Sequence, residues 1–138
     1  MSRVVFVDTS AWLPVFVRRD PLHAWADRTL TELVSNGAQL VTSNLVIAEL
    51  HVLILRRIGI AEALKWLESV RADQSYDVRF ADRNLHGAAI DRWLRPFRDQ
   101  GFSLADAVSF EIMRQEGIRT AFALDRHFAA AGFELLLG

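Results

Sequence analysis

Short runs of β-type residues alternate with longer helical patterns along the chain, and this alternation narrows the possible folds more than any other feature. Five strands are expected, at 3–8, 39–42, 76–80, 120–124 and 133–136. Seven helices are expected, at 10–18, 22–36, 44–58, 60–72, 82–99, 104–116 and 126–131. Strands that alternate with helices favour a mostly parallel sheet covered on both faces. We therefore expect an α/β fold in three layers, with four or five strands in the sheet.

The helical patterns end on glycine, and the chain has the extent of one domain. Five glycines lie just beyond helical patterns, where a left-handed C-cap is favoured: Gly37, Gly59, Gly101, Gly117 and Gly132. The 138 residues contain no Pro/Ser-rich linker, internal repeat or low-complexity stretch. The sequence therefore predicts a single domain over residues 1–138.

Composition excludes several kinds of site. The chain has no cysteine, so disulfides and thiolate metal sites are ruled out. No apolar run approaches the roughly 18 residues of a membrane span, which predicts a protein without a membrane partner in a reducing, cytoplasmic compartment. The net charge is −1, but 15 of the 16 basic residues are arginine, a side chain that binds phosphate in bidentate fashion.

Three acidic residues stand where the expected elements begin or end. Asp8 ends the first strand, Asp125 follows the fourth, and Asp106 lies in the first turn of the helix at 104–116. Function collects at the carboxyl ends of parallel strands, where helix N-termini also meet. Each aspartate also has a structural explanation as a helix cap, and Ser103 and Asp106 have the spacing of a capping box.

Glu49 is the fourth acidic residue of interest, and it is expected on the most apolar face of the helix at 44–58. Its neighbours at helical spacing are all apolar: Leu45, Val46, Val52 and Leu53. A buried carboxylate costs several kcal/mol unless a positive charge compensates it. The compensating charge is expected to be either Arg56 on the same face or a cation shared with the three aspartates.

Four converging carboxylates without cysteine describe a metal site made of oxygen ligands. Such a site suits Mg²⁺ or Mn²⁺ and disfavours zinc. Ions of this kind bound by carboxylates point to phosphoryl chemistry, because they bind phosphodiester oxygens and lower the pKa of water. The sequence lacks the late strand-end lysine of receiver domains, the D-x-D of haloacid-dehalogenase phosphatases and a Gly-rich nucleotide loop.

The stretches that carry the acids resemble the four acidic motifs of PIN-domain ribonucleases. They read "VVFVDTSAW", "TSNLVIAEL", "GFSLADAVSF" and "TAFALDRHFAAAGFELL". Their order, their spacing and the total length are most similar to the single-domain VapC-type toxins of bacterial toxin–antitoxin pairs. By this resemblance the acidic quartet falls on Asp8, Glu49, Asp106 and Asp125, and the supporting hydroxyl positions fall on Thr9, Ser10 and Ser103.

The resemblance implies a PIN-like fold and a Mg²⁺- or Mn²⁺-dependent endoribonuclease that cleaves tRNA, rRNA or mRNA. It also implies a homodimer and inhibition by a cognate VapB-type antitoxin. An arginine-rich rim that includes Arg18, Arg19 and Arg126 is expected to contact RNA phosphates. Two alternatives stay open: an RNA-processing PIN nuclease that is not a toxin, and a non-catalytic RNA-binding PIN module. Some of the aromatic residues are expected at an interface, although most should belong to the core.

Overall fold

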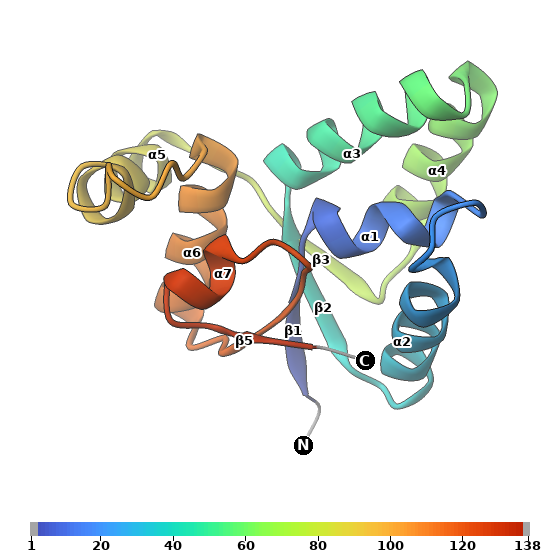
Figure 1. Cartoon of the computed structure of the whole chain (residues 1–138), viewed down its shortest axis with the longest axis horizontal. Helices are drawn as coiled ribbons and strands as arrows, with labels where there is room; N and C mark the ends of the chain where they lie inside the picture. Colours follow the sequence, from blue (N-terminus) through green and yellow to red (C-terminus); the bar gives the residue numbers. More distant parts are fainter. Residues whose placement is uncertain (1–2, 137–138) are drawn as a thin grey trace.

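A five-stranded sheet in which all pairs are parallel forms the centre of the molecule (Figure 1). The computed structural model describes residues 3–136. The strands are β1 (Val4–Val7), β2 (Gln39–Ser43), β3 (Tyr76–Arg79), β4 (Thr120–Phe122) and β5 (Glu134–Leu135). They lie in the order β3-β2-β1-β4-β5, so the first strand is central.

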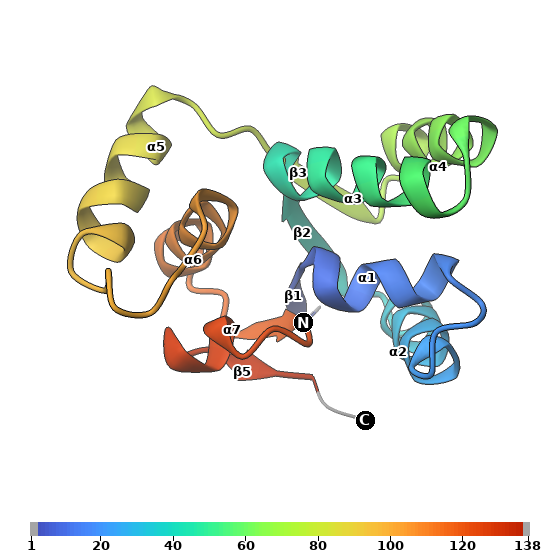
Figure 2. The same cartoon turned by 45° about the horizontal axis from the view of Figure 1, so that its top comes forward.

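Helices cover both faces of this sheet. They are α1 (Thr9–Phe16), α2 (His23–Ser35), α3 (Asn44–Arg57), α4 (Ile60–Ala72), α5 (Arg83–Ala89), the π-helix η1 (Ile90–Leu94), α6 (Leu104–Glu116) and α7 (His127–Ala130). Figures 1 and 2 show α1 to α4 on one side of the sheet and α5, α6 and α7 on the other. The predicted three-layer α/β fold is confirmed. None of the helices within residues 3–136 is both long enough and apolar enough to cross a membrane.

Strand β1 is apolar throughout because it lies in the middle of the sheet. Val5, Phe6 and Val7 are all completely buried, as expected for a strand covered on both faces. The strand therefore ends in the interior, and Asp8 directly follows it there. The central strand therefore places the carboxylate of Asp8 in a part of the molecule that is largely shielded from solvent.

The expected helix at 82–99 is the one element that the structure divides. Regular helix α5 ends at Ala89, and the next turn is π-helical, with the amide of Arg95 bonded to the carbonyl of Ile90. The wider turn directs Trp93 toward α6, where its ring is buried and its Nε1 donates to Glu111. The other predicted helices and strands are present, and their ends differ from the predicted bounds by at most two residues. The five predicted glycines all have positive φ, and Gly117 (φ 68°) is the left-handed C-cap of α6.

Most of the aromatic residues belong to the core, as predicted. Trp12 and Trp66 are buried and meet edge to face, with ring centroids 5.2 Å apart. Trp93 is also buried, and it stacks with Phe97, which is partly exposed. Of these rings, Phe97 is the one with a surface free to meet a partner.

Candidate active site

Asp8 lies at the carboxyl end of β1 and caps helix α1. Its Oδ2 accepts hydrogen bonds from the amide of Ser10 (3.1 Å) and from the hydroxyl of Ser10 (2.6 Å). Only 6% of the residue is exposed. The capping explanation therefore applies to this residue, but it uses only Oδ2, and the other oxygen accepts no hydrogen bond from residues 3–136.

Ser10 joins the two turns that carry Asp8 and Asp125. Its Oγ donates to Asp8 and accepts from the amides of Leu124 (2.8 Å) and Asp125 (3.1 Å). One hydroxyl thus fixes the distance between the end of β1 and the segment after β4, which are more than a hundred residues apart in sequence.

Asp106 reaches the same place from the first turn of α6. It forms a capping box with Ser103: the Ser103 hydroxyl accepts from the Asp106 amide (3.0 Å), and Asp106 Oδ2 accepts from the Ser103 amide (3.1 Å). The side chain of Asp106 is 12% exposed. The reciprocal cap fixes the start of α6 and thereby the direction of this carboxylate.

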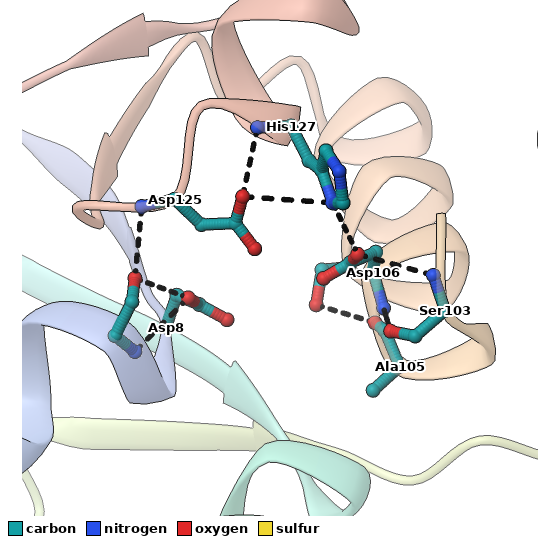
Figure 3. A network of polar contacts seen from close by, with 8 residues as sticks. Asp8, Ser103, Ala105, Asp106, Asp125 and His127 are labelled. Atoms are coloured by element: carbon teal, nitrogen blue, oxygen red, sulfur yellow. Dashed lines mark hydrogen bonds and ion pairs between the residues drawn. The ribbon is translucent and has the colours of Figure 1, made fainter. Parts of the chain in front are cut away.

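Asp125 completes a cluster with Asp106 and His127. Its Oδ1 accepts from the His127 amide (2.9 Å), and the imidazole Nδ1 lies 3.5 Å from the same oxygen and 3.0 Å from Oδ2 of Asp106. One potential ligand atom from each of these three residues lies within 4.8 Å of the others. Figure 3 shows the carboxylates of Asp8, Asp106 and Asp125 turned toward a common space.

The electrostatics of the cluster favour a cation. Burial raises the pKa of Asp8, the two hydrogen bonds from Ser10 lower it, and the charges of Asp106 and Glu49 raise it again, to about 6. The hydrogen bond to Asp106 raises the pKa of His127, and the charge of Asp125 adds to this effect. Within residues 3–136 no lysine or arginine forms an ion pair with any of these three aspartates.

Comparison with known families identifies the family of the chain. The model of the PIN domain matches residues 5–134, which is nearly the whole chain. The chain belongs to the PIN-domain family. Its relatives include the 23S rRNA-specific endonuclease VapC20 of Mycobacterium tuberculosis, 34% identical over 94% of this chain and 95% of that protein. They also include ribonuclease VapC26 of the same species, 30% identical over 91% of this chain and 90% of that protein.

A solved PIN-domain structure has the same fold. The crystal structure of VapC20 from Mycobacterium tuberculosis, a sarcin–ricin loop cleaving toxin, superposes with a TM-score of 0.82. The two chains are 34% identical, and the match covers 94% of this chain and 95% of the other. At this similarity the order of strands and helices around the site is shared.

The structure corrects the expectation that Glu49 is buried in this PIN domain. Glu49 is exposed, because α3 buries a narrow stripe (Val46, Leu50 and Ile54) and leaves the adjoining apolar side chains partly or largely open. The ion pair with Arg56, one of the two explanations that the sequence left open for Glu49, is not formed among the described residues. Glu49 nevertheless lies close enough to Asp8 for its charge to raise the pKa of that carboxyl.

Three other expected positions, Thr9, Arg18 and Arg19, make no hydrogen bond or ion pair with the aspartates among the described residues. Thr9 is buried, and its Oγ1 has no hydrogen-bond partner within the described range. Arg18 and Arg19 follow the far end of α1, about 12 Å along the helix from Asp8, so they do not border the aspartates. Arg126 is exposed and adjacent to Asp125.

His127 is the residue that sequence reasoning missed. Its position two residues after Asp125, in "DRHF", was visible, but a lone histidine gives no local sign of its neighbours. The contact with Asp106 depends on how α6 and α7 pack together.

The donor set of this PIN domain fits a hard divalent cation. Three aspartate carboxylates face one space, and one of them has a raised pKa that a cation would relieve. Oxygen donors of this kind suit Mg²⁺ and Mn²⁺. Asp8, Asp106 and Asp125 would hold the ion, with Glu49 at the exposed side.

Proposed function

We propose that this PIN-domain protein is a metal-dependent endoribonuclease and the toxin of a type II toxin–antitoxin pair. The observation that carries the proposal is the convergence of Asp8, Asp106 and Asp125 from three separate elements, without a lysine or arginine paired to them among residues 3–136. The names of the relatives support the ribonuclease activity, since they are an endonuclease specific for 23S rRNA and a ribonuclease. We treat residues 1–138 as one catalytic domain that acts in the cytoplasm, where ribosomal RNA is found.

The proposed metal is Mg²⁺ or Mn²⁺. Bound there, it would supply a water of lowered pKa and stabilise charge on the phosphodiester oxygens. Asp8, Asp106 and Asp125 are the proposed ligands. Glu49 is exposed in the N-terminal half of α3, and we propose that it contacts the ion through a bound water rather than as a direct ligand.

The protein's own residues would bind and orient the phosphodiester. Helix α1 begins after Asp8 and α6 begins after Ser103, so two helix N-termini lie beside the aspartates. Helix N-termini attract phosphate through their free amides and their dipole. Arg126 is the exposed arginine beside Asp125 and is proposed to contact a flanking phosphate. The substrate proposed on this basis is structured RNA, with ribosomal RNA first because of the relatives.

A groove at the far end of α1 is the proposed docking site of a VapB-type antitoxin. It has a volume of about 640 Å³ and lies between α1, α3 and α4. Phe16, Ile58 and Trp66 contribute apolar surface to it, whereas its charged lining is mostly basic (Arg18, Arg19, Arg57 and Lys65, against Glu62). An amphipathic helix with an acidic rim complements such a groove. Helix α1 begins beside Asp8 and ends at the groove, so a bound antitoxin would lie at the opposite end of α1 from the aspartates.

The groove proposal can be tested by charge reversal. Arg57→Glu should weaken capture of the antitoxin from a co-expressed neighbouring gene, because it reverses one of the four basic charges. RNA cleavage by the free variant should remain at the level of the unmodified protein, since Arg57 lies far from the aspartates. Equal capture by both proteins would place the antitoxin elsewhere.

A homodimer is proposed as the active assembly. Exposed apolar side chains occur on α3 (Val52 and Leu55) and on or near the π-helix (Ile90 and Phe97), and they offer surface for self-association. Light scattering at micromolar concentration should give the mass of a dimer. A monomer at that concentration would contradict the proposal.

The nuclease proposal is tested by incubating the purified protein with ribosomal RNA and with other structured RNA, with and without Mg²⁺ or Mn²⁺, and mapping the new ends. Cleavage should need the metal, stop with a chelator and disappear in Asp106→Asn. RNA binding without cleavage in any metal would favour the non-catalytic alternative. Cleavage without growth inhibition in cells would favour a processing nuclease that is not a toxin.

A further inference from the structure

His127 lies between two of the site carboxylates and contacts both. Its backbone amide donates to Oδ1 of Asp125 (2.9 Å), and its ring Nδ1 lies 3.0 Å from Oδ2 of Asp106. The ring is 35% exposed, so one side is open to solvent while the other faces the aspartates. A single residue therefore links the segment after β4 to the first turn of α6.

The hydrogen bonds in the cluster divide the aspartate oxygens into two sets. Oδ2 of Asp8 is occupied by Ser10, Oδ2 of Asp106 by Ser103 and His127, and Oδ1 of Asp125 by the His127 amide. The second oxygen of each carboxylate accepts no hydrogen bond from residues 3–136. Each aspartate thus has one oxygen held by the protein and one that is available to a ligand.

We infer that His127 is a positioning residue of the metal site. Its ring holds one oxygen of Asp106 and its backbone amide holds one oxygen of Asp125, so that the second oxygen of each aspartate faces the ion. The inference rests on the proposed function, because it assumes that the aspartates bind a metal. Partners that hold a ligand in this way set its orientation, and removing one typically weakens metal binding about 10- to 100-fold.

The geometry separates this role from that of a metal ligand. Oδ2 of Asp106 is an acceptor, so the ring must donate a proton from Nδ1 to make the 3.0 Å contact. A ring nitrogen that carries this proton has no lone pair with which to bind an ion. A ligand role would therefore require the Asp106 contact to break, or the ring to turn and present Nε2.

The ring and the backbone of His127 are both held in place by neighbours. Phe102 meets the imidazole edge to face, with centroids 5.2 Å apart. The next residue, Phe128, is completely buried and packs edge to face on Phe110 of α6 at 4.9 Å. The buried ring anchors α7 to α6, and this anchoring fixes the position from which His127 reaches Asp106.

The test compares Mn²⁺ affinity in His127→Ala, His127→Asn and His127→Gln. The asparagine amide nitrogen takes nearly the place of Nδ1 and can donate to Asp106, whereas the glutamine amide extends to the place of Nε2. We expect Ala and Gln to raise the dissociation constant for Mn²⁺ at least about tenfold and Asn to restore it to within about threefold. His86→Ala on α5 is the matched control and should bind like the unmodified protein.

A spectroscopic measurement distinguishes positioning from ligation. With Mn²⁺ bound to the unmodified protein, electron spin-echo spectra should contain no modulation from a directly coordinated ¹⁴N nucleus. The ratio of Mn²⁺ to Mg²⁺ affinity should also be the same in His127→Asn and in the unmodified protein, because the ligands are oxygens in both. A nitrogen signal that disappears in His127→Asn would overturn the inference in favour of a ligand.

The remaining results distinguish a failure of the positioning role from a failure of the proposed function. Thermal melts without metal show whether each variant folds, and if His127→Ala does not fold, the comparison of Asn with Gln decides. Equal Mn²⁺ affinity in the Gln variant and the unmodified protein would overturn the positioning role while the proposed function stood. No Mn²⁺ binding by the unmodified protein, or equal binding by Asp8→Asn, would instead contradict the proposed function.

Discussion

Asp8 and Glu111 are both buried carboxylates, but their surroundings are opposite. Glu111, on α6, has no exposed side-chain surface and accepts hydrogen bonds from Trp93 (3.1 Å), Arg114 (2.8 and 3.1 Å) and Gln115 (2.8 Å). Arg92 adds an ion pair at 3.2 Å. Burial raises the pKa of Glu111, but the hydrogen bonds from Arg114, Gln115 and Trp93 outweigh it and lower the pKa to about 2.

Asp8 is almost as deeply buried, yet its hydrogen bonds come from a single neutral residue, Ser10. The charges that influence it, Asp106 and Glu49, have the same sign as its own, and its pKa stands at about 6. The protein thus satisfies one buried carboxylate completely and leaves the other in need of a positive charge. A carboxylate with a structural role is compensated by arginine side chains of the protein itself, whereas a carboxylate that binds a metal needs a cation from solution.

The largest expected effect comes from Asp8→Asn. Cleavage of RNA should fall by about 10³-fold or more, equivalent to roughly 4 kcal/mol of transition-state stabilisation, because a neutral amide is a poorer metal ligand. The free energy of unfolding without metal should be unchanged or higher, since a buried charge has been removed. Single-turnover cleavage and urea denaturation measure the two quantities. A variant that cleaves normally would remove Asp8 from the site.

The second-largest expected effect is a different pH dependence of the free energy of unfolding for Asp8 and for Glu111. In the folded protein Asp8 has a pKa of about 6, against about 3.9 for an unfolded chain, so the folded state holds more protons between these values. Its contribution to stability is present below about pH 4 and is lost as the pH rises to 6, by up to about 3 kcal/mol at 1.36 kcal/mol per pH unit. Glu111, whose pKa is lowered, loses its contribution only below about pH 4.

Urea denaturation at several pH values without metal tests this expectation. The decline between pH 4 and 6 should be present in the unmodified protein and largely absent in Asp8→Asn. Millimolar Mn²⁺ should make this decline smaller, because the ion binds the ionised carboxylate and therefore adds more stability at pH 6 than at pH 4. Equal slopes in the unmodified and Asp8→Asn proteins would show that another group controls this range.

Glu111→Gln should affect stability and leave activity alone. The change weakens the charged hydrogen bonds from Arg114 and the ion pair with Arg92, whose side chains are about half exposed. We expect a loss of about 2 kcal/mol in the free energy of unfolding. Cleavage per folded molecule should match the unmodified protein. A large loss of cleavage at full folding would mean that Glu111 helps to position Asp106, five residues earlier on α6.

The smallest effect is expected from Glu49→Gln. Because Glu49 is exposed and acts at longer range, cleavage should fall about tenfold, roughly 1.4 kcal/mol, while the free energy of unfolding stays within about 0.5 kcal/mol. Glu68→Gln, on the exposed side of α4, is the matched control and should change neither quantity. Destabilisation with normal cleavage would return Glu49 to a structural role.

The sequence by itself determined the alternation of strands and helices, the left-handed end of α6 at Gly117, and the three aspartates at element ends. These features depend on local signals. A helix cap or a buried strand is specified by residues a few positions apart, and their energies do not require knowledge of the neighbouring elements. The capping box of Ser103 and Asp106 could therefore be read directly, and the prediction that these aspartates share one edge followed from the parallel sheet.

Tertiary structure alone decided the remaining features of the site. Whether Glu49 is buried depends on which stripe of α3 packs against the core, and apolar residues around most of that helix left the choice open. The bridge from Ser10 to the turn after β4 joins residues 114 and 115 positions apart, and the contact of His127 with Asp106 requires α6 and α7 to pack together. Such contacts are set by the rotation and approach of whole elements, which minimise exposed apolar surface over the entire chain.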